Sequence, residues 1–187
     1  MGIYIDVMST LVRVLAADNI DNSTKQSWQK LIDADMRQGG NGSSLSPRDK
    51  FDYDCCLYAL LHRQLDPAQW DVLVAKYSTH KANKVAAIGR LVARMVSPAP
   101  QLFVYKALTA WAIPKMKGVQ TVKRSTDMIV LPAEFYDMNT WDTEGKPEST
   151  RRRWRTGIAK RLESLEEAAV VHATEIFDKE EIFIDAA

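Results

Sequence analysis

A long segment near the C-terminus, residues 147–177, has no proline after its first residue and one internal glycine. Apolar side chains recur along it at spacings of four, four, three and four residues. They are Trp154, Ile158, Leu162, Leu165 and Ala169. Because an α-helix completes a turn in about 3.6 residues, these positions form one stripe along one side of a helix. The segment therefore predicts a single long helix with a buried apolar stripe.

The rest of the chain also favours helices, since Gly and Pro are confined to a few places and strand-like alternation is rare. Ser46-Pro47 and Asp66-Pro67 are typical helix starts, with a capping side chain followed by proline in the first turn. Helices are expected over residues 5–17, 22–37, 47–65, 67–77, 81–96 and 102–113. Residues 128–131 fit either a short strand or the apolar entry to a helix. The prediction is an all-α, mainly helical bundle.

The chain of 187 residues is long enough for one full core or two small domains. Residues 38–44, with the sequence QGGNGSS, have the composition of a flexible linker. We expect three segments: an N-terminal helical segment with the linker (residues 1–44), a central helical domain (45–126), and a C-terminal segment (127–187).

The C-terminal segment has the layout of a helix-turn-helix. A short helix is expected over residues 132–138, a turn with Gly145 over 139–146, and the long helix follows. From Lys146 to Arg161 there are seven basic residues and one acid, although the whole chain carries a net charge of only +1. The signal for nucleic acid is therefore local rather than global.

Arginine at the start of a recognition helix can donate two hydrogen bonds to guanine, and neighbouring hydroxyl and cationic groups can hold phosphates. Basic residues are also unfavourable at the positive end of a helix dipole unless an anion is supplied, and a stable helix would more often begin with acids. The candidate DNA-binding residues are Ser149, Thr150, Arg151, Arg152, Arg153, Arg155 and Lys160. The alternative is a solvated basic face without a ligand.

Past Leu162 the same helix becomes acidic, so this end should point away from DNA. It would be free or docked on a basic surface, for which the residues 81–94 face and residues 115–124 are candidates. Of the five tryptophans, Trp141 is the one whose place in a turn suits base stacking; the others are expected to be core anchors.

The chemistry of enzymes and metals is not indicated. His62, His80 and His172 are scattered and have no cysteine at zinc-ligand spacing. No phosphate-binding loop or nucleophile motif occurs. We expect a non-enzymatic protein without cofactor or metal.

Two further features concern the compartment and an alternative function. Adjacent Cys55 and Cys56 are expected to be reduced thiols with one facing the core, and no apolar run reaches the roughly 20 residues of a membrane span. Both favour a cytoplasmic protein. Asp49, Asp52 and Asp54 leave open a metal-dependent nuclease as an alternative.

The stretch PESTRRRWRTGIAKRLESLEEA, residues 147–168, resembles the recognition helix of sigma-factor region 4 and related phage regulators. The wider plan, with DPAQWDVLVAKYS in a Pro-started helix, resembles the phage late-gene antitermination proteins, the Q proteins. The lambda type of that family carries a zinc-binding cysteine motif that this sequence lacks, so the resemblance is to a zinc-free branch.

The resemblance implies a sequence-specific transcription regulator of a bacterial host cytoplasm. Such a protein binds double-stranded DNA, engages RNA polymerase and its sigma factor, and acts as a monomer or dimer. The resemblance assigns residues 149–155 to DNA. A phage DNA-packaging protein similar to a terminase small subunit is a further alternative, and it would form a ring of many copies.

Overall fold

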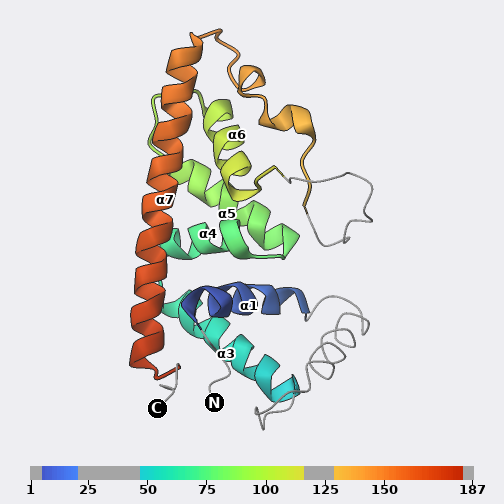
Figure 1. Ribbon diagram of the computed structural model, residues 1–187, viewed down its shortest axis with the longest axis vertical. Helices are drawn as coiled ribbons and strands as arrows, with labels where there is room; N and C mark the ends of the chain where they lie inside the picture. The colour runs from blue at the N-terminus through green and yellow to red at the C-terminus, as the bar shows by residue number, and fades with distance from the viewer. Residues whose placement is uncertain (1–5, 21–46, 116–128, 183–187) are drawn as a thin grey trace. The chain divides into compact units, whose positions relative to one another are not determined.

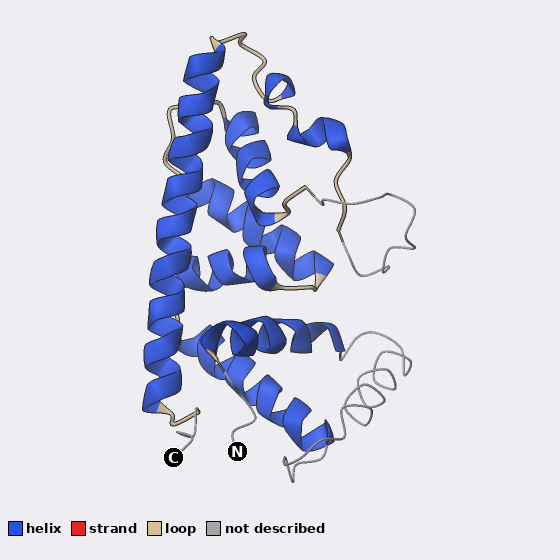
Figure 2. Ribbon diagram, viewed as in Figure 1, coloured by secondary structure: helices blue, strands red, loops and turns tan. Residues whose placement is uncertain are grey.

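The structure, a computed structural model, describes residues 6–20, 47–115 and 129–182. Within these ranges the chain is mainly helical and has no strand, so the all-α prediction is confirmed (Figures 1 and 2). In chain order the elements are α1 (Val7–Ile20), α3 (Pro47–Gln64), α4 (Pro67–Tyr77), α5 (Lys81–Arg94), α6 (Gln101–Ala112), the 3₁₀-helices η1 (Ala133–Tyr136) and η2 (Met138–Thr140), and α7 (Glu148–Lys179). The helix expected over residues 22–37 and the linker 38–44 lie outside the described residues.

Helix starts follow the sequence signals. α3 begins at Pro47 and α4 at Pro67, as the Ser-Pro and Asp-Pro pairs predict. α7 ends at Lys179, after which Glu181 adopts a positive φ of 50° and the Ile182 amide donates to the Phe177 carbonyl at 3.0 Å. This is the bond of a Schellman-type helix end. Residues 129–131 form neither of the two expected structures, strand or helix.

The chain forms two compact units, and their boundaries cut across the three segments expected from composition. One unit contains Met1–Pro67 with Ala169–Ala187, and the other contains Ala68–Ala168. α7 contributes residues to both units, because the boundary between them falls between residues 168 and 169 and the helix continues through it without a break.

In the first unit, α1 packs on α3. The buried apolar side chains are Leu11, Val14, Leu15, Leu57, Leu61, Leu65, Ala169, Ala173, Ile176 and Phe177. Asp54 of α3 is also buried, and its carboxylate accepts a 2.8 Å hydrogen bond from Arg13 of α1. The expectation that Cys55 or Cys56 faces the core is wrong, since both residues are exposed and neither forms a disulfide bond. The helix turns its Leu57–Leu61 side inward and so turns the cysteines outward.

The second unit is built on α4, α5 and α6 with the first part of α7. α4 is buried from Trp70 to Ala75, which explains its almost continuous apolar sequence. Phe103 of α6 lies between two indole rings, with ring centroids 5.4 Å from Trp141 and 5.5 Å from Trp154, both edge-on. Such edge-to-face contacts stabilise a core beyond the burial of area alone. They hold the start of α7 and the segment before it against α6.

Candidate nucleic-acid interface

The turn before α7 is organised by Asp142. Its carboxylate accepts hydrogen bonds from the backbone amides of Glu144 at 2.9 Å and Lys146 at 2.6 Å. Gly145 adopts φ +69°, which L side chains rarely adopt. The carbonyl of Pro147 then accepts the first helical hydrogen bond, from Arg151 at 3.2 Å. The position at which the basic helix begins is therefore fixed by local hydrogen bonds.

α7 separates its residues into two faces in this unit. Ile158 and Leu162 are buried and Trp154 is half-buried, as the predicted stripe requires. Successive residues of a helix are rotated by about 100°, so the side opposite the stripe faces solvent. It carries the exposed residues Ser149, Arg152, Arg153, Thr156 and Lys160, which we call the outer cationic face.

The structure places the seven candidate residues on different sides of the helix. Ser149, Arg152, Arg153 and Lys160 lie on the outer cationic face, whereas Thr150 and Arg151 are half-buried on the packing side. The Nε of Arg151 is buried and has no hydrogen-bond partner among the described residues. Arg155 is exposed, with its guanidinium carbon 5.6 Å from the ring centroid of Trp141. The basic run in the sequence is therefore only partly a surface.

The start of the helix also contains an acid. Glu148 occupies the first turn of α7 and pairs with Arg152 one turn later, at 2.6 Å between Nη2 and Oε1. Both side chains are exposed, so the pair contributes little to stability. It does place a negative charge at the positive end of the helix dipole. The arginines at the start of α7 are therefore partly compensated by an acid of the same turn, and an external anion is not the only possible source of negative charge there.

The helix-turn-helix is not confirmed. The first helix expected before the turn consists instead of η1 and η2, which are 3₁₀-helices of four and three residues. Asp137 separates them, because it has an extended backbone and its carboxylate accepts the Asn139 amide at 3.0 Å. The segment is fastened to α6 and its C-terminal end, since Lys106 donates to the Thr140 carbonyl at 3.0 Å and Tyr136 to the Ile113 carbonyl at 2.8 Å.

The prediction that Trp141 is available for base stacking is wrong. Its side chain is 1% exposed, and its indole N–H donates to the Phe135 carbonyl at 2.7 Å. The turn folds back onto α6, so that the ring packs against Phe103 rather than facing solvent. Trp141 is a core anchor of the second unit.

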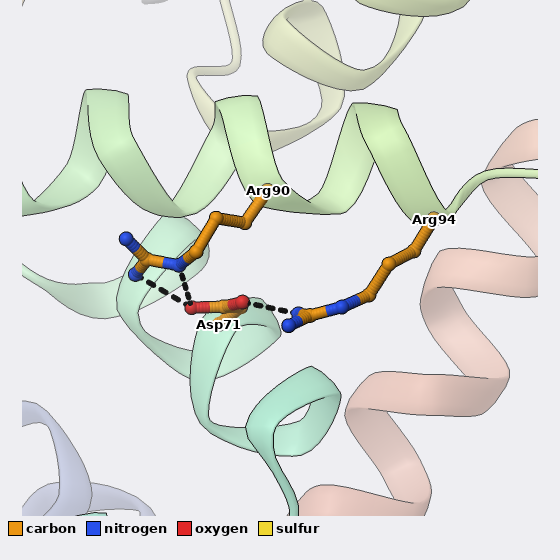
Figure 3. A network of polar contacts seen from close by, with 3 residues as sticks. All are labelled: Asp71, Arg90 and Arg94. Carbon is orange, nitrogen blue, oxygen red and sulfur yellow. Dashed lines mark hydrogen bonds and ion pairs between the residues drawn. The ribbon is translucent and has the colours of Figure 1, made fainter.

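A polar network that the sequence pattern did not predict joins α4 to α5 (Figure 3). The carboxylate of Asp71, 2% exposed, accepts hydrogen bonds from Arg90 Nε at 2.9 Å and Nη2 at 2.7 Å, and a further bond from Arg94 Nη1. This hydrogen bonding raises the pKa of Arg90. Arg90 and Arg94 belong to the residues 81–94 face, one of the two candidate docking surfaces for the acidic end of the long helix, and in the structure both contact Asp71. The sequence feature that could have indicated this network is Asp71 itself, a single acid within the apolar segment of α4 that needs a buried partner.

A second polar cluster lies where α4 ends. Lys84 of α5 donates to the carbonyls of Lys76 at 3.1 Å and Ser78 at 3.2 Å, and its burial, together with the charge of Lys76, lowers its pKa to about 8. Tyr77 donates to Glu166 of α7, and burial followed by this contact raises the pKa of Tyr77. The Nζ of Lys76 lies 3.8 Å from Oε2 of the same Glu166 carboxylate. These contacts join three helices and leave Lys84 partly withdrawn from solvent.

The described residues can be compared with what a metal site or a membrane-spanning helix requires. They contain no group of three or more His, Cys, Asp or Glu side chains arranged to hold a metal ion. Asp54, one of the three acids considered for a nuclease, pairs with Arg13. His80 caps α5 by accepting the Asn83 amide at 3.2 Å. None of the described helices is long and apolar enough to cross a membrane.

No protein-family model, curated protein or solved structure matches the sequence. In the part of the chain that the structure describes, the geometry defines a mainly helical protein with a cationic face on α7, the longest of the described helices. The outer cationic face is the candidate functional surface because its charged side chains are exposed and positive, and because the opposite side of the helix is packed in the core.

Proposed function

We propose that the chain binds double-stranded DNA through the outer cationic face of α7 and acts as a regulator of transcription. One observation carries the proposal. Arg152, Arg153 and Lys160 lie on the exposed side of α7, and the opposite side of this helix is buried in the core. A rigid helix loses little conformational freedom when its side chains meet a ligand.

The dimensions suit a duplex. Arg153 and Lys160 are seven residues apart, which is about 10 Å along a helix axis, and the major groove is about 12 Å wide. Arginine and lysine at both ends of this stretch suit phosphates on the groove edges, and Ser149 and Thr156 add hydroxyl groups. The acidic run that starts at Glu163 limits the proposed contact to about the first four turns.

A narrower proposal is a phage late-gene antiterminator that engages bacterial RNA polymerase and its sigma factor. Its support is the resemblance of residues 147–168 to the recognition helix of sigma-factor region 4. Its test is transcription past a terminator in a purified system with and without the protein. Read-through that depends on the protein would support the narrower proposal, and termination at an unchanged site would contradict it.

The test of DNA binding is selection of a site from a random duplex pool, followed by affinity measurements at several salt concentrations. The variant Arg152→Ala/Arg153→Ala/Lys160→Ala removes three cations of the outer face and leaves the half-buried Arg151 untouched. If all three contact phosphates, the slope of log affinity against log salt should fall in magnitude by about 2.7, or about 0.9 for each contact.

The matched control is Arg48→Ala/Arg63→Ala/Lys179→Ala, which removes three exposed cations from α3 and the end of α7. This variant loses the same charge, so it should keep the wild-type slope if binding is local. Equal losses in both variants, or no binding by the wild-type protein at low salt, would contradict the proposed function.

A further inference from the structure

The exposed side of α7 changes its charge along the helix. Exposed residues recur there at spacings of three and four residues, so they form a single stripe on one side of the helix. We call this the charged stripe, and its members are Ser149, Arg153, Thr156, Lys160, Ser164, Glu167, Val171, Glu175 and Asp178. The charged side chains before Ser164 are basic, whereas those after it are acidic. One side of a single helix therefore presents opposite charges at its two ends.

The charges of the stripe are arranged symmetrically about Ser164. The midpoint between Arg153 and Glu175 falls on Ser164, and the midpoint between Lys160 and Glu167 falls directly before it. If a second copy of α7 lies antiparallel to the first, with a two-fold axis at this point, each of these cations lies opposite the matching acid of the other copy. A parallel arrangement would instead place like charges opposite one another.

These four charges are also left over within the described part of the chain. In those residues, no ion pair involves Arg153, Lys160, Glu167 or Glu175. The sequence leaves the acidic end of this helix free or docked on a basic surface. The basic half of the same helix in a second copy is such a surface, so the charged stripe is complementary to itself.

Gly157 and Val171 support the same arrangement. Glycine inside a helix is destabilising relative to alanine, and a Cβ added at Gly157 would meet no atom within 4 Å. Packing among the described residues therefore does not call for glycine at this position. Val171 is 54% exposed, and its midpoint with Gly157 is again Ser164. In the antiparallel arrangement, the apolar side chain of Val171 lies over the open space at Gly157 of the other copy.

We propose that two copies of this chain associate through the charged stripe of α7, antiparallel and with two-fold symmetry. Arg153 pairs with Glu175 and Lys160 with Glu167 across the interface, and each pair occurs twice. The inference goes beyond DNA binding and does not depend on it. Because Arg153 and Lys160 also belong to the outer cationic face, a second copy and a DNA duplex would occupy the same surface in turn.

The test measures mass in the absence of DNA, by sedimentation velocity over a range of protein concentrations. At about 50 mM salt, the wild-type protein should approach twice the 21.1 kDa of one chain as its concentration rises. Since ion pairs at a surface are screened by salt, the dissociation constant should rise by about tenfold or more at about 500 mM salt.

The main variants reverse charges across the interface. Lys160→Glu and Glu167→Lys should each raise the dissociation constant by about tenfold or more, because each change makes two attractive pairs repulsive. The double variant Lys160→Glu/Glu167→Lys should dimerise like the wild-type protein, since both pairs are present again with exchanged signs. Arg63→Glu is the matched control, because it makes the same change of charge at an exposed position of α3 and should leave the dimer unchanged.

A further variant tests the packing at the glycine. Gly157→Leu places a larger side chain where Val171 of the other copy lies, so it should also raise the dissociation constant by about tenfold. The added side chain faces open space in the single chain, so urea unfolding at high salt should show no loss of stability.

A wild-type protein that stays at 21.1 kDa at low salt, or a dimer that both single reversals leave intact, would overturn the proposal. It would also be overturned if the double variant stays monomeric while circular dichroism shows an unchanged helix content. Because no DNA is present, these outcomes are independent of whether the outer cationic face binds a duplex.

Discussion

Lys84 is a side chain whose pKa departs from its usual value into a pH range in which stability can be measured. Its ammonium group donates to two carbonyls at the end of α4 and is close to the charge of Lys76. The carbonyls at a helix end lack partners within the helix, so a lysine that reaches them acts as a cap. The cost is burial of a charge, and this is why its pKa falls to about 8.

Stability should therefore rise with pH just above neutrality. Below pH 8 the lysine is protonated in both states; between pH 8 and 9.5 the unfolded chain keeps a proton that folded Lys84 has lost, so folding becomes more favourable. The rise is at most about 1.4 kcal/mol per pH unit, the slope for one whole proton. Ionisation of unfolded Tyr77 opposes it only above about pH 10.

The measurement is urea unfolding of the wild-type protein and of Lys84→Arg from pH 7.5 to 9.5. Arginine stays charged throughout, so the difference between the two free energies of unfolding should grow with pH. Parallel curves would show that the folded chain does not release the Lys84 proton in this range.

At the scale of elements, the two sides of α7 have different roles: one side packs in the core, and the other is the candidate DNA-binding surface. Leu162 is fully buried in the second unit, whereas Lys160 two residues earlier is exposed. The same helix thus carries a core contact and a candidate DNA contact within one turn. Substitutions on its two sides should affect different properties.

Leu162→Ala should lower the free energy of unfolding by about 3 kcal/mol, since it removes buried methyl groups and leaves a cavity. Lys160→Ala should change stability by less than about 0.5 kcal/mol but weaken duplex binding. Chemical denaturation and binding at a denaturant-free, fixed salt concentration measure the two effects. A large loss of stability in Lys160→Ala would mean that the two sides of the helix are not separated as described.

For the whole molecule, charge is balanced in total and uneven along the chain. The net charge is +1, yet residues 146–161 carry seven basic residues and one acid. Attraction to DNA then depends on a local surface, because the sum of charges produces little long-range field.

Raising the pH from 7 to 9 should therefore leave duplex binding largely intact, although it carries the chain past its isoelectric point near 7.7. Arginine remains charged over this range, so the proposed contacts persist. We expect the dissociation constant to rise by less than about tenfold, a cost below about 1.4 kcal/mol. Loss of binding in step with net charge would instead indicate a general electrostatic attraction.

Among the described residues, local sequence determined most of the helix positions. The prolines at 47 and 67, the apolar spacing of α7 and the Gly145 turn act through backbone geometry and near neighbours, so they can be read without the fold. The exception is the segment before α7, where Asp137 splits an expected helix into two 3₁₀-helices through a bond two residues away.

Tertiary packing alone decided which charged and aromatic side chains are available. Helical spacing already puts Arg151, three residues before Trp154, on the side of the apolar stripe, but only the contact of Trp154 with Phe103 shows that α6 covers that side. In the same way, Asp71 finds Arg90 and Arg94 across a helix pair. Periodicity fixes the faces of a helix, whereas the partners of each face depend on contacts between residues distant in the chain, which no local pattern encodes.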